Sequence, residues 1–186
     1  MTVRPVLMLL VLCLGCPKPR PRIDPELQSK ICRTFRFEAF QAPASAATPA
    51  PDDEIFLWRD FCFVDCPQYQ VTIKGDGRVI LVMLNGPVVG LESYSIDPAL
   101  ASRLFAEFEM LGFATRPFVR TSENITCSQT VTLKQMVGAK VTSVVSDSRV
   151  FERAHSERLQ HLHALVETVA RVGEHVAQCP QLGPKD

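Results

Sequence analysis

The stretch Tyr69-Gln-Val-Thr-Ile-Lys-Gly-Asp-Gly-Arg-Val-Ile-Leu-Val-Met-Leu84 decides the fold class of this chain. Its first part alternates apolar and polar residues as far as Ile73, and this period of two predicts a half-buried strand. Gly75-Asp76-Gly77 predicts a tight hairpin, because glycine adopts the positive backbone angles that such turns require. The following run from Val79 to Leu84 is apolar throughout, so we expect a strand covered on both faces at the centre of a sheet.

Further strands are expected on both sides of this hairpin. Glu54 to Phe61 is rich in aromatic and branched residues, and Val88 to Ile96 returns after a turn that contains Gly86-Pro87. Later in the chain, Gly138-Ala-Lys140 separates two more apolar segments, which begin at Val131 and Val141. We expect these segments to form a second hairpin of the same sheet.

Two helices are expected between and after the hairpins. Asp97-Pro98 predicts a helix start, because a carboxylate caps free N–H groups and proline suits the first helical position. Gly112 predicts the end of that helix. A final helix is expected from about Ser156 to Ala177, with Glu167 on its polar face, placed to pair with Arg171 four residues later. The order strands, helix, strands, helix predicts an α+β domain, an antiparallel sheet of hairpins with two helices packed on it.

The N-terminus predicts export. Arg4 precedes an apolar run from Val6 to Leu14, which is typical of a secretory signal, whereas a membrane span needs roughly 20 residues. Gly15-Cys16 resembles the lipobox of bacterial lipoproteins, although Cys13 stands where that motif has leucine. The resemblance implies that residues 1–15 are removed and that lipid on Cys16 anchors the mature chain to a membrane. An ordinary signal peptide cut nearby, or an uncleaved anchor, is the alternative.

Residues 16–51 are expected to connect the anchor to the domain. Pro17 to Arg22 alternates proline with basic residues and predicts an extended tether, because proline fixes its backbone and lacks an N–H donor. A short segment that starts at Asp24-Pro25 follows, and residues 41–51, rich in alanine and proline, predict a flexible linker. A single domain is therefore expected at residues 52–180.

The composition narrows the function classes. Lysine plus arginine and aspartate plus glutamate both number 20, so the chain has no net positive charge that would attract nucleic acid. We therefore expect no nucleic-acid partner. With its leader, the chain is expected to be a membrane-anchored lipoprotein of the bacterial envelope, at the outer membrane or the periplasmic face.

One motif resembles a known family. Cys62-Phe-Val-Asp-Cys66-Pro67-Gln-Tyr69, followed by Asp76-Gly77, is similar to the signature of a bacterial family of exported proteins known as a domain of unknown function. That family has Cys-Phe-Gly-x-Cys-Pro-x-Tyr and then a strand that ends in Asp-Gly, and valine replaces the glycine here. The resemblance spans roughly Glu54 to Val176. It implies a fold and an exported location, and no reaction, because the family has no assigned activity.

Cys62 and Cys66 lie between two expected strands, with three residues between them. A tight turn can bring them to disulfide distance, and the bond would fix the turn that presents Tyr69. The alternative is thiol-redox or Cu(I) chemistry, because two soft thiolates at this spacing suit Cu(I). Cys-x-x-x-Cys-Pro also resembles the site of exported copper-delivery proteins with a thioredoxin fold. In that fold the cysteines lie where a strand gives way to a helix, so the strand-like residues after Pro67 argue against this alternative.

The remaining cysteines suit an oxidising compartment. Of seven cysteines, one lies in the leader and Cys16 is assigned to lipid, so five remain and at least one stays outside an internal bond. Cys32 and Cys179 either join the N-terminal segment to the end of the domain or stay unpaired. Cys127 is the expected odd thiol.

No residue pattern predicts catalysis. His161 and His163 point about 200° apart on a helix and cannot hold one metal from one face, and His155 is expected to pack or cap. We expect neither a cofactor nor a metal. The expected function is a non-enzymatic envelope domain that binds a protein partner or stabilises an assembly. The rival is the thiol or Cu(I) protein at Cys62 and Cys66, and a hydrolase of envelope polymers has no motif in its favour.

Overall fold

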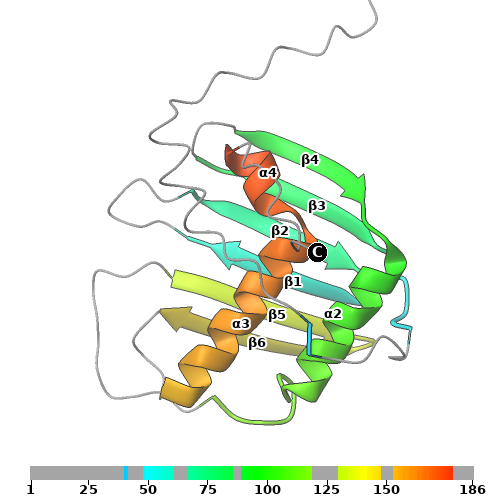
Figure 1. Ribbon diagram of the computed structural model, residues 1–186, viewed down its shortest axis with the longest axis vertical. Helices are drawn as coiled ribbons and strands as arrows, with labels where there is room; N and C mark the ends of the chain where they lie inside the picture. The colour runs from blue at the N-terminus through cyan, green and yellow to red at the C-terminus, as the bar shows by residue number, and fades with distance from the viewer. Residues whose placement is uncertain are drawn as a thin grey trace, which may run out of the picture.

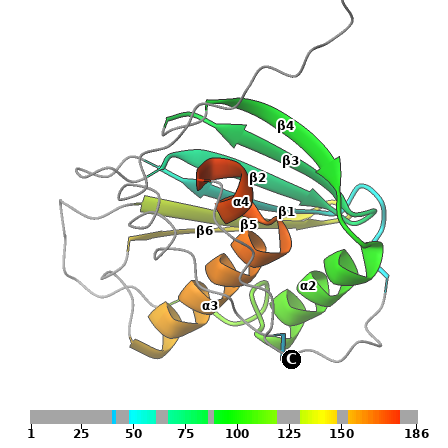
Figure 2. The same ribbon diagram turned by 45° about the horizontal axis from the view of Figure 1, so that its top comes forward.

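The computed structural model describes residues 40–41, 48–60, 67–85, 89–118, 130–147 and 153–177. Within them, six strands form one antiparallel sheet in the order β4-β3-β2-β1-β5-β6. Three helices lie on one face of this sheet (Figure 1), and the tilted view of Figure 2 shows them as a separate layer beneath it. The predicted α+β fold is therefore confirmed. The elements are β1 (Glu54–Arg59), β2 (Tyr69–Lys74), β3 (Arg78–Met83), β4 (Gly90–Ser95), α2 (Pro98–Met110), β5 (Thr130–Val137), β6 (Lys140–Asp147), α3 (Arg153–Val169) and α4 (Val172–Ala177).

The sheet is built from two sets of neighbouring strands that meet at β1. Strands β2, β3 and β4 follow one another as hairpins, and β5 and β6 form the hairpin that adds to the other side of β1. The expectation that the apolar run after Gly77 forms the sheet centre was wrong, because β1 and β2 occupy the central positions and β3 lies one strand from an edge.

The apolar run of β3 is covered on one face by the helices of the structure. Val79, Leu81 and Met83 are buried, whereas Ile80 and Val82 alternate with them and are half-buried. Because strand side chains alternate between faces, Ile80 and Val82 lie on the side opposite the three helices. No described element covers that second face at β3.

The predicted hairpin between β2 and β3 is confirmed. Gly77 has a positive φ of 87°, and its N–H donates to the Lys74 carbonyl at 2.9 Å. The Asp76 carboxylate accepts from the backbone N–H of Arg78 at 3.0 Å, so a side-chain hydrogen bond also stabilises the turn. A Cβ at Gly75 would lie 2.0 Å from the Ala50 carbonyl oxygen, so this position requires glycine for close packing.

Helix α2 has the predicted boundaries. The Asp97 side chain accepts from the Ala99 N–H at 2.9 Å, and Pro98 occupies the first turn. Gly112 ends the helix with a positive φ of 66°, and the N–H of Phe113 then donates to the Phe108 carbonyl at 2.9 Å.

The final helix differs from the prediction because it is broken into α3 and α4. Arg171 adopts a positive φ of 51° between them. The break keeps both Ala170 and Val172 at 0% exposure, and it leaves the Ala170 carbonyl to accept a hydrogen bond from the Tyr94 hydroxyl of β4. A straight helix would rotate one of these flanking side chains away from the core. No described helix has the length and apolar character of a membrane span.

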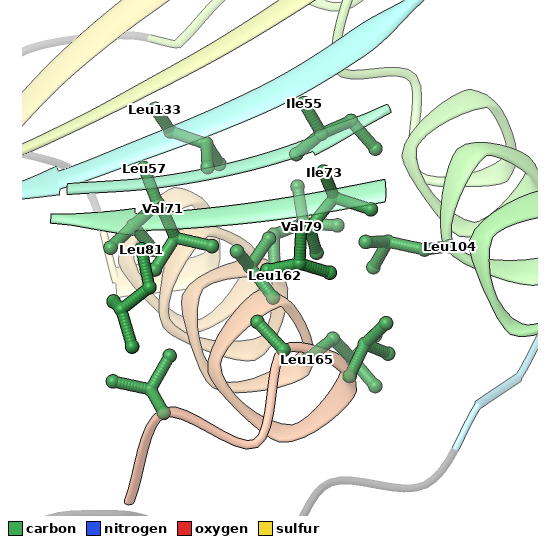
Figure 3. Close-up of a cluster of buried hydrophobic side chains, with 14 of the residues drawn as sticks. Ile55, Leu57, Val71, Ile73, Val79, Leu81, Leu104, Leu133, Leu162 and Leu165 are labelled. Carbon is green, nitrogen blue, oxygen red and sulfur yellow. The ribbon is translucent and has the colours of Figure 1, made fainter. Parts of the chain in front are cut away.

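The core lies between the helices and the central strands. Figure 3 shows Leu162 and Leu165 of α3 and Leu104 of α2 directed at the apolar side chains of the sheet. All three are fully buried, and each burial of this kind contributes about 2 kcal/mol. This packing fixes α3 across the middle of the sheet, where polar side chains of β1 and β2 also face it. The buried sheet residues labelled in Figure 3 are Ile55, Leu57, Val71, Ile73, Val79, Leu81 and Leu133.

Candidate functional site

A group of polar side chains is buried where α3 crosses β1 and β2, and we call it the buried polar cluster. It consists of Arg59, Tyr69, His163 and Glu167. The sheet register places Arg59 of β1 directly opposite Tyr69 of β2. His163 and Glu167 are four residues apart on α3, so they lie on one side of that helix. The tyrosine of the family-like motif therefore meets the C-terminal half of α3.

Glu167 joins the two strands to the helix. The Tyr69 hydroxyl donates to Glu167 Oε1 at 2.6 Å, and Arg59 Nε donates to the same oxygen. Glu167 is 4% exposed and Tyr69 is fully buried. Burial is the largest cause that raises the pKa of Tyr69. Burial is the largest single influence on the pKa of Arg59 and acts to lower it, but the charge of Glu167 together with the charge of Tyr69 and the hydrogen bonds to both outweighs burial, so the pKa is raised. The cluster thus holds a neutral phenol and a protonated guanidinium.

His163 is the fourth member, and one of its ring nitrogens, Nε2, has no hydrogen-bond partner among the described residues. The residue is 6% exposed. Burial, followed by the charge of Arg59, lowers the pKa of His163 to about 3. The imidazole is therefore neutral near pH 7. A neutral buried ring suits packing better than proton transfer at that pH.

The contacts of the buried polar cluster are suited to holding elements of the fold together rather than to catalysis. One carboxylate oxygen takes both donors, and all three partners come from different elements, so the contacts tie α3 to the two central strands. Tyr69 is thus an aromatic residue of the core. The expected pair of Glu167 with Arg171 was wrong, because Glu167 is buried and Arg171 instead contacts Glu174, with Nε and Oε1 at 3.0 Å. The buried phenol was the missed signal, since a buried hydroxyl needs a partner.

A second buried carboxylate ties the two longer helices together. Glu107 of α2 is fully buried, and its Oε1 lies 3.1 Å from His161 Nε2 of α3. Its other oxygen accepts from the backbone N–H of Gln41 at 2.9 Å. The Arg103 guanidinium lies over the Phe40 ring, with 4.4 Å between the guanidinium carbon and the ring centre. Residues 40 and 41 thus contact α2.

Asp53 binds three turns of the domain together. One carboxylate oxygen accepts from the Gly138 N–H at 2.8 Å, and the other accepts from the Ala50 N–H at 2.9 Å. Its carbonyl accepts from the Gly75 N–H at 2.8 Å. This residue therefore links the β2–β3 turn to the β5–β6 turn. The sequence offered no signal for it beyond its position before a strand.

The histidines are dispersed across the helical layer. His155 packs edge-on against Phe118, with 6.2 Å between ring centres, as expected of a packed residue. His175 contacts the Glu92 carboxylate of β4 and stacks on Tyr94, with 4.4 Å between ring centres. In the described part of the chain, no three side chains of the kinds that ligate metals gather in one place.

A pocket lies beside the edge strand β6, and we call it the β6 pocket. Residues 113–118, which follow α2, form one wall, and residues 142–145 of β6 form the other. Figure 1 shows the chain after α2 running toward the start of α3. The cavity has a volume of about 490 Å³ and includes Phe113, Phe118 and Val144 as apolar lining and Arg116 as its cation.

The predicted motif residues are only partly described. Pro67 is buried next to β2, and Asp76 and Gly77 form the hairpin turn. The predicted lipid site and both predicted disulfides lie outside the described residues, as does the Cu(I) alternative. Those interpretations therefore stay predictions. The residues concerned are Cys16, Cys32, Cys62, Cys66, Cys127 and Cys179.

The fold and the buried polar cluster define an α+β domain whose sheet carries helices on one face and whose motif tyrosine anchors a helix. Residues 53–170 match the family model described as a domain of unknown function, DUF6438, and the chain belongs to this family. The predicted resemblance to a domain of unknown function is confirmed at that level. A comparison with curated proteins found no match.

Proposed function

We propose that this protein is an exported envelope lipoprotein whose domain is a non-enzymatic module that binds a protein partner. The leader and the Gly15-Cys16 junction support export and a lipid anchor. The tether that follows would hold the domain away from the lipid surface.

The proposed binding role rests on the difference between the polar residues of the interior and those of the β6 pocket. Inside, Glu167 and Glu107 are each held by donors from other elements, so these carboxylates serve the fold. At the β6 pocket, the apolar walls and Arg116 face a cavity of about 490 Å³, which is within the typical range of roughly 300–1,000 Å³ for ligand pockets. Recognition is thus supported at the edge of the sheet rather than in the buried polar cluster.

Site-directed photo-crosslinking of the full chain in a bacterial envelope tests this role. Ser143 on β6 and Ser93 on β4 are exposed serines on the two edge strands, so a photoreactive residue at either position is tolerated and the two form a matched pair. We expect a discrete protein adduct from position 143 and none from position 93. Absence of any adduct at both positions, under several envelope conditions, would contradict a binding role.

The lipid anchor is tested separately. Metabolic labelling with a clickable fatty acid should mark the full chain, and Cys16→Ser should remove the label and leave the leader uncleaved by lipoprotein processing. Labelling that persists in Cys16→Ser would contradict the assignment of the anchor to this cysteine.

A further inference from the structure

The turn that follows α2 fixes an arginine at the opening of the β6 pocket. The N–H of Arg116 donates to the Gly112 carbonyl at 2.8 Å. The arginine stem lies over the same glycine, since a Cβ at Gly112 would be 2.7 Å from Arg116 Cγ. Residues 115–117 are exposed, whereas Phe113 behind them is 1% exposed. One short segment thus gives the pocket an apolar wall and a cation at its opening.

This cation has no anionic partner in the described part of the chain. No ion pair of the described residues joins a carboxylate to Arg116 or to its neighbour Arg158 of α3. Arg158 stacks on Phe118, with 3.9 Å from the guanidinium carbon to the ring centre, and one of its amino groups lies 3.5 Å from the Arg116 carbonyl. Two arginines therefore lie near each other without a carboxylate.

Arg158 shows the consequence of this arrangement. Its Nε is buried and has no hydrogen-bond partner among the described residues. Burial, followed by the charge of Arg116, lowers the pKa of Arg158. An anion bound at Arg116 would offset this repulsion. A planar guanidinium can hold a carboxylate through two parallel hydrogen bonds, so the charges at the opening favour a carboxylate.

The dimensions of the pocket limit what can carry that carboxylate. Its volume of about 490 Å³ lies toward the lower end of the range for ligand pockets, roughly 300–1,000 Å³. Phe113, Val144 and Arg116 border this one small space, so an apolar group and an anionic group must come from the same small part of the ligand. In a protein, the last residue meets this condition, because its side chain and its α-carboxylate share one Cα.

We propose that the β6 pocket binds the C-terminal residue of a partner protein. The α-carboxylate pairs with Arg116, and the apolar side chain of that residue enters between Phe113 and Val144. This inference rests on the proposed binding role and names the part of the partner that is recognised. The contacts use side chains of the pocket and require no backbone group of β6. The apolar walls favour such a residue over an inorganic anion, which would use only the charge.

A peptide titration tests the proposal on the full chain, labelled with ¹⁵N and held in micelles of a non-ionic detergent. The probe is a hexapeptide of glycine and serine that ends in leucine with a free carboxylate, and the comparison peptide differs only in a C-terminal amide. NMR shifts of the backbone amides give both the affinity and the location. We expect the free acid to shift residues 113–118 and 142–145 and to leave β4 unchanged. The amide should bind at least about tenfold more weakly, the loss typical of one charge-assisted contact.

Two variants separate the charge from the cavity. Arg116→Gln should weaken binding of the free acid about tenfold, whereas Arg78→Gln, which changes an exposed arginine in the distant β2–β3 turn, should leave it unchanged. Thr142 is half-buried and lines the pocket, so Thr142→Phe should fill the cavity and abolish binding, and Thr142→Ser should retain it. Urea unfolding of each variant shows whether it still folds.

Several results would overturn the proposal. These are a free-acid peptide that does not bind, an amidated peptide that binds equally well, unchanged affinity in Arg116→Gln, or unchanged affinity in a folded Thr142→Phe. A medium-chain fatty acid that binds in an Arg116-dependent way, where the free-acid peptide does not, would also overturn it, in favour of a lipid site.

Failure here is distinguishable from failure of the binding role itself. If a photoreactive residue at Ser143 captures a protein and the free-acid peptide does not bind, the partner is recognised by another chemistry and the binding role stands. If neither position 143 nor position 93 captures a protein and the peptide does not bind, both proposals fail.

Discussion

Replacing His163 with leucine should remove a large part of the acid sensitivity of this domain. The ring is 6% exposed, and burial together with the Arg59 charge lowers its pKa from 6.5 to about 3. In the unfolded chain the same ring titrates near its ordinary value of about 6.5. Between these two values the unfolded state binds a proton that the folded state does not.

The sign and size of the effect follow from this difference. Since the folded pKa is the lower one, the contribution of His163 to stability is complete above about pH 6.5 and is lost as the pH falls toward 3. The loss amounts to about 1.4 kcal/mol per pH unit. Lowering the pH from 6.5 to 5.0 should therefore destabilise the native protein by about 2 kcal/mol through this ring alone.

Urea unfolding at pH 7.5 and pH 5.0 measures the effect, with fluorescence of Trp58, the single tryptophan, as the signal. Between these pH values the native protein should lose about 2 kcal/mol more than His163→Leu. The two proteins differ only at position 163, so the difference between their losses reports the imidazole. His155→Leu, at a half-buried position of the same helix, should keep the full acid sensitivity. Parallel losses in the native protein and His163→Leu, or an NMR titration of His163 above pH 6, would refute the reasoning.

Three further changes probe the same architecture by urea unfolding at pH 7.5. Tyr69→Phe removes one buried hydrogen bond to Glu167 and should cost about 1–2 kcal/mol; an unchanged midpoint would mean that the hydroxyl contributes nothing. Glu167→Ala removes the buried carboxylate that accepts from both Arg59 and Tyr69 and should cost more, about 3 kcal/mol, so a smaller loss than in Tyr69→Phe would contradict its role in holding α3 to the strands. Gly77→Ala forces a positive φ of 87° on alanine and brings its Cβ within 2.7 Å of the Ile96 carbonyl oxygen, so we expect a loss above about 1 kcal/mol, and a stabilised protein would show that the turn relaxes.

Local sequence signals predicted most of the fold because the elements are short and clearly delimited. Asp97-Pro98 and Gly112 predicted the two ends of α2 correctly. Their effects act on nearby backbone groups and dihedral angles, so they do not depend on the tertiary context. The β2–β3 hairpin follows from Gly77 in the same way. Strand order was less accessible, because pairing of β1 with β5 joins segments far apart in the chain.

The candidate sites were not predictable from local patterns. Helical spacing places Glu167 on the polar face of α3, and its burial depends on the phenol of Tyr69 and the guanidinium of Arg59, which lie far away in the sequence. The helix break at Arg171 has the same origin, because burial of its neighbours outweighs the local preference of arginine for a negative φ. The β6 pocket lies between a loop and an edge strand, and no periodicity in the sequence predicts that these two segments are neighbours.

The buried polar cluster also explains why the motif tyrosine lies where it does. A shift of β2 by one residue against β1 would turn Tyr69 to the other face of the sheet, because strand side chains alternate. Glu167 would then lose the Tyr69 hydroxyl, and Arg59 would face the carboxylate alone. The same shift would also turn the buried Val71 and Ile73 out of the core, so the cluster adds to a register that the apolar pattern of β2 already favours. The cluster and the apolar side chains therefore act together to fix the register of β2 against β1 and the position of α3 over these two strands.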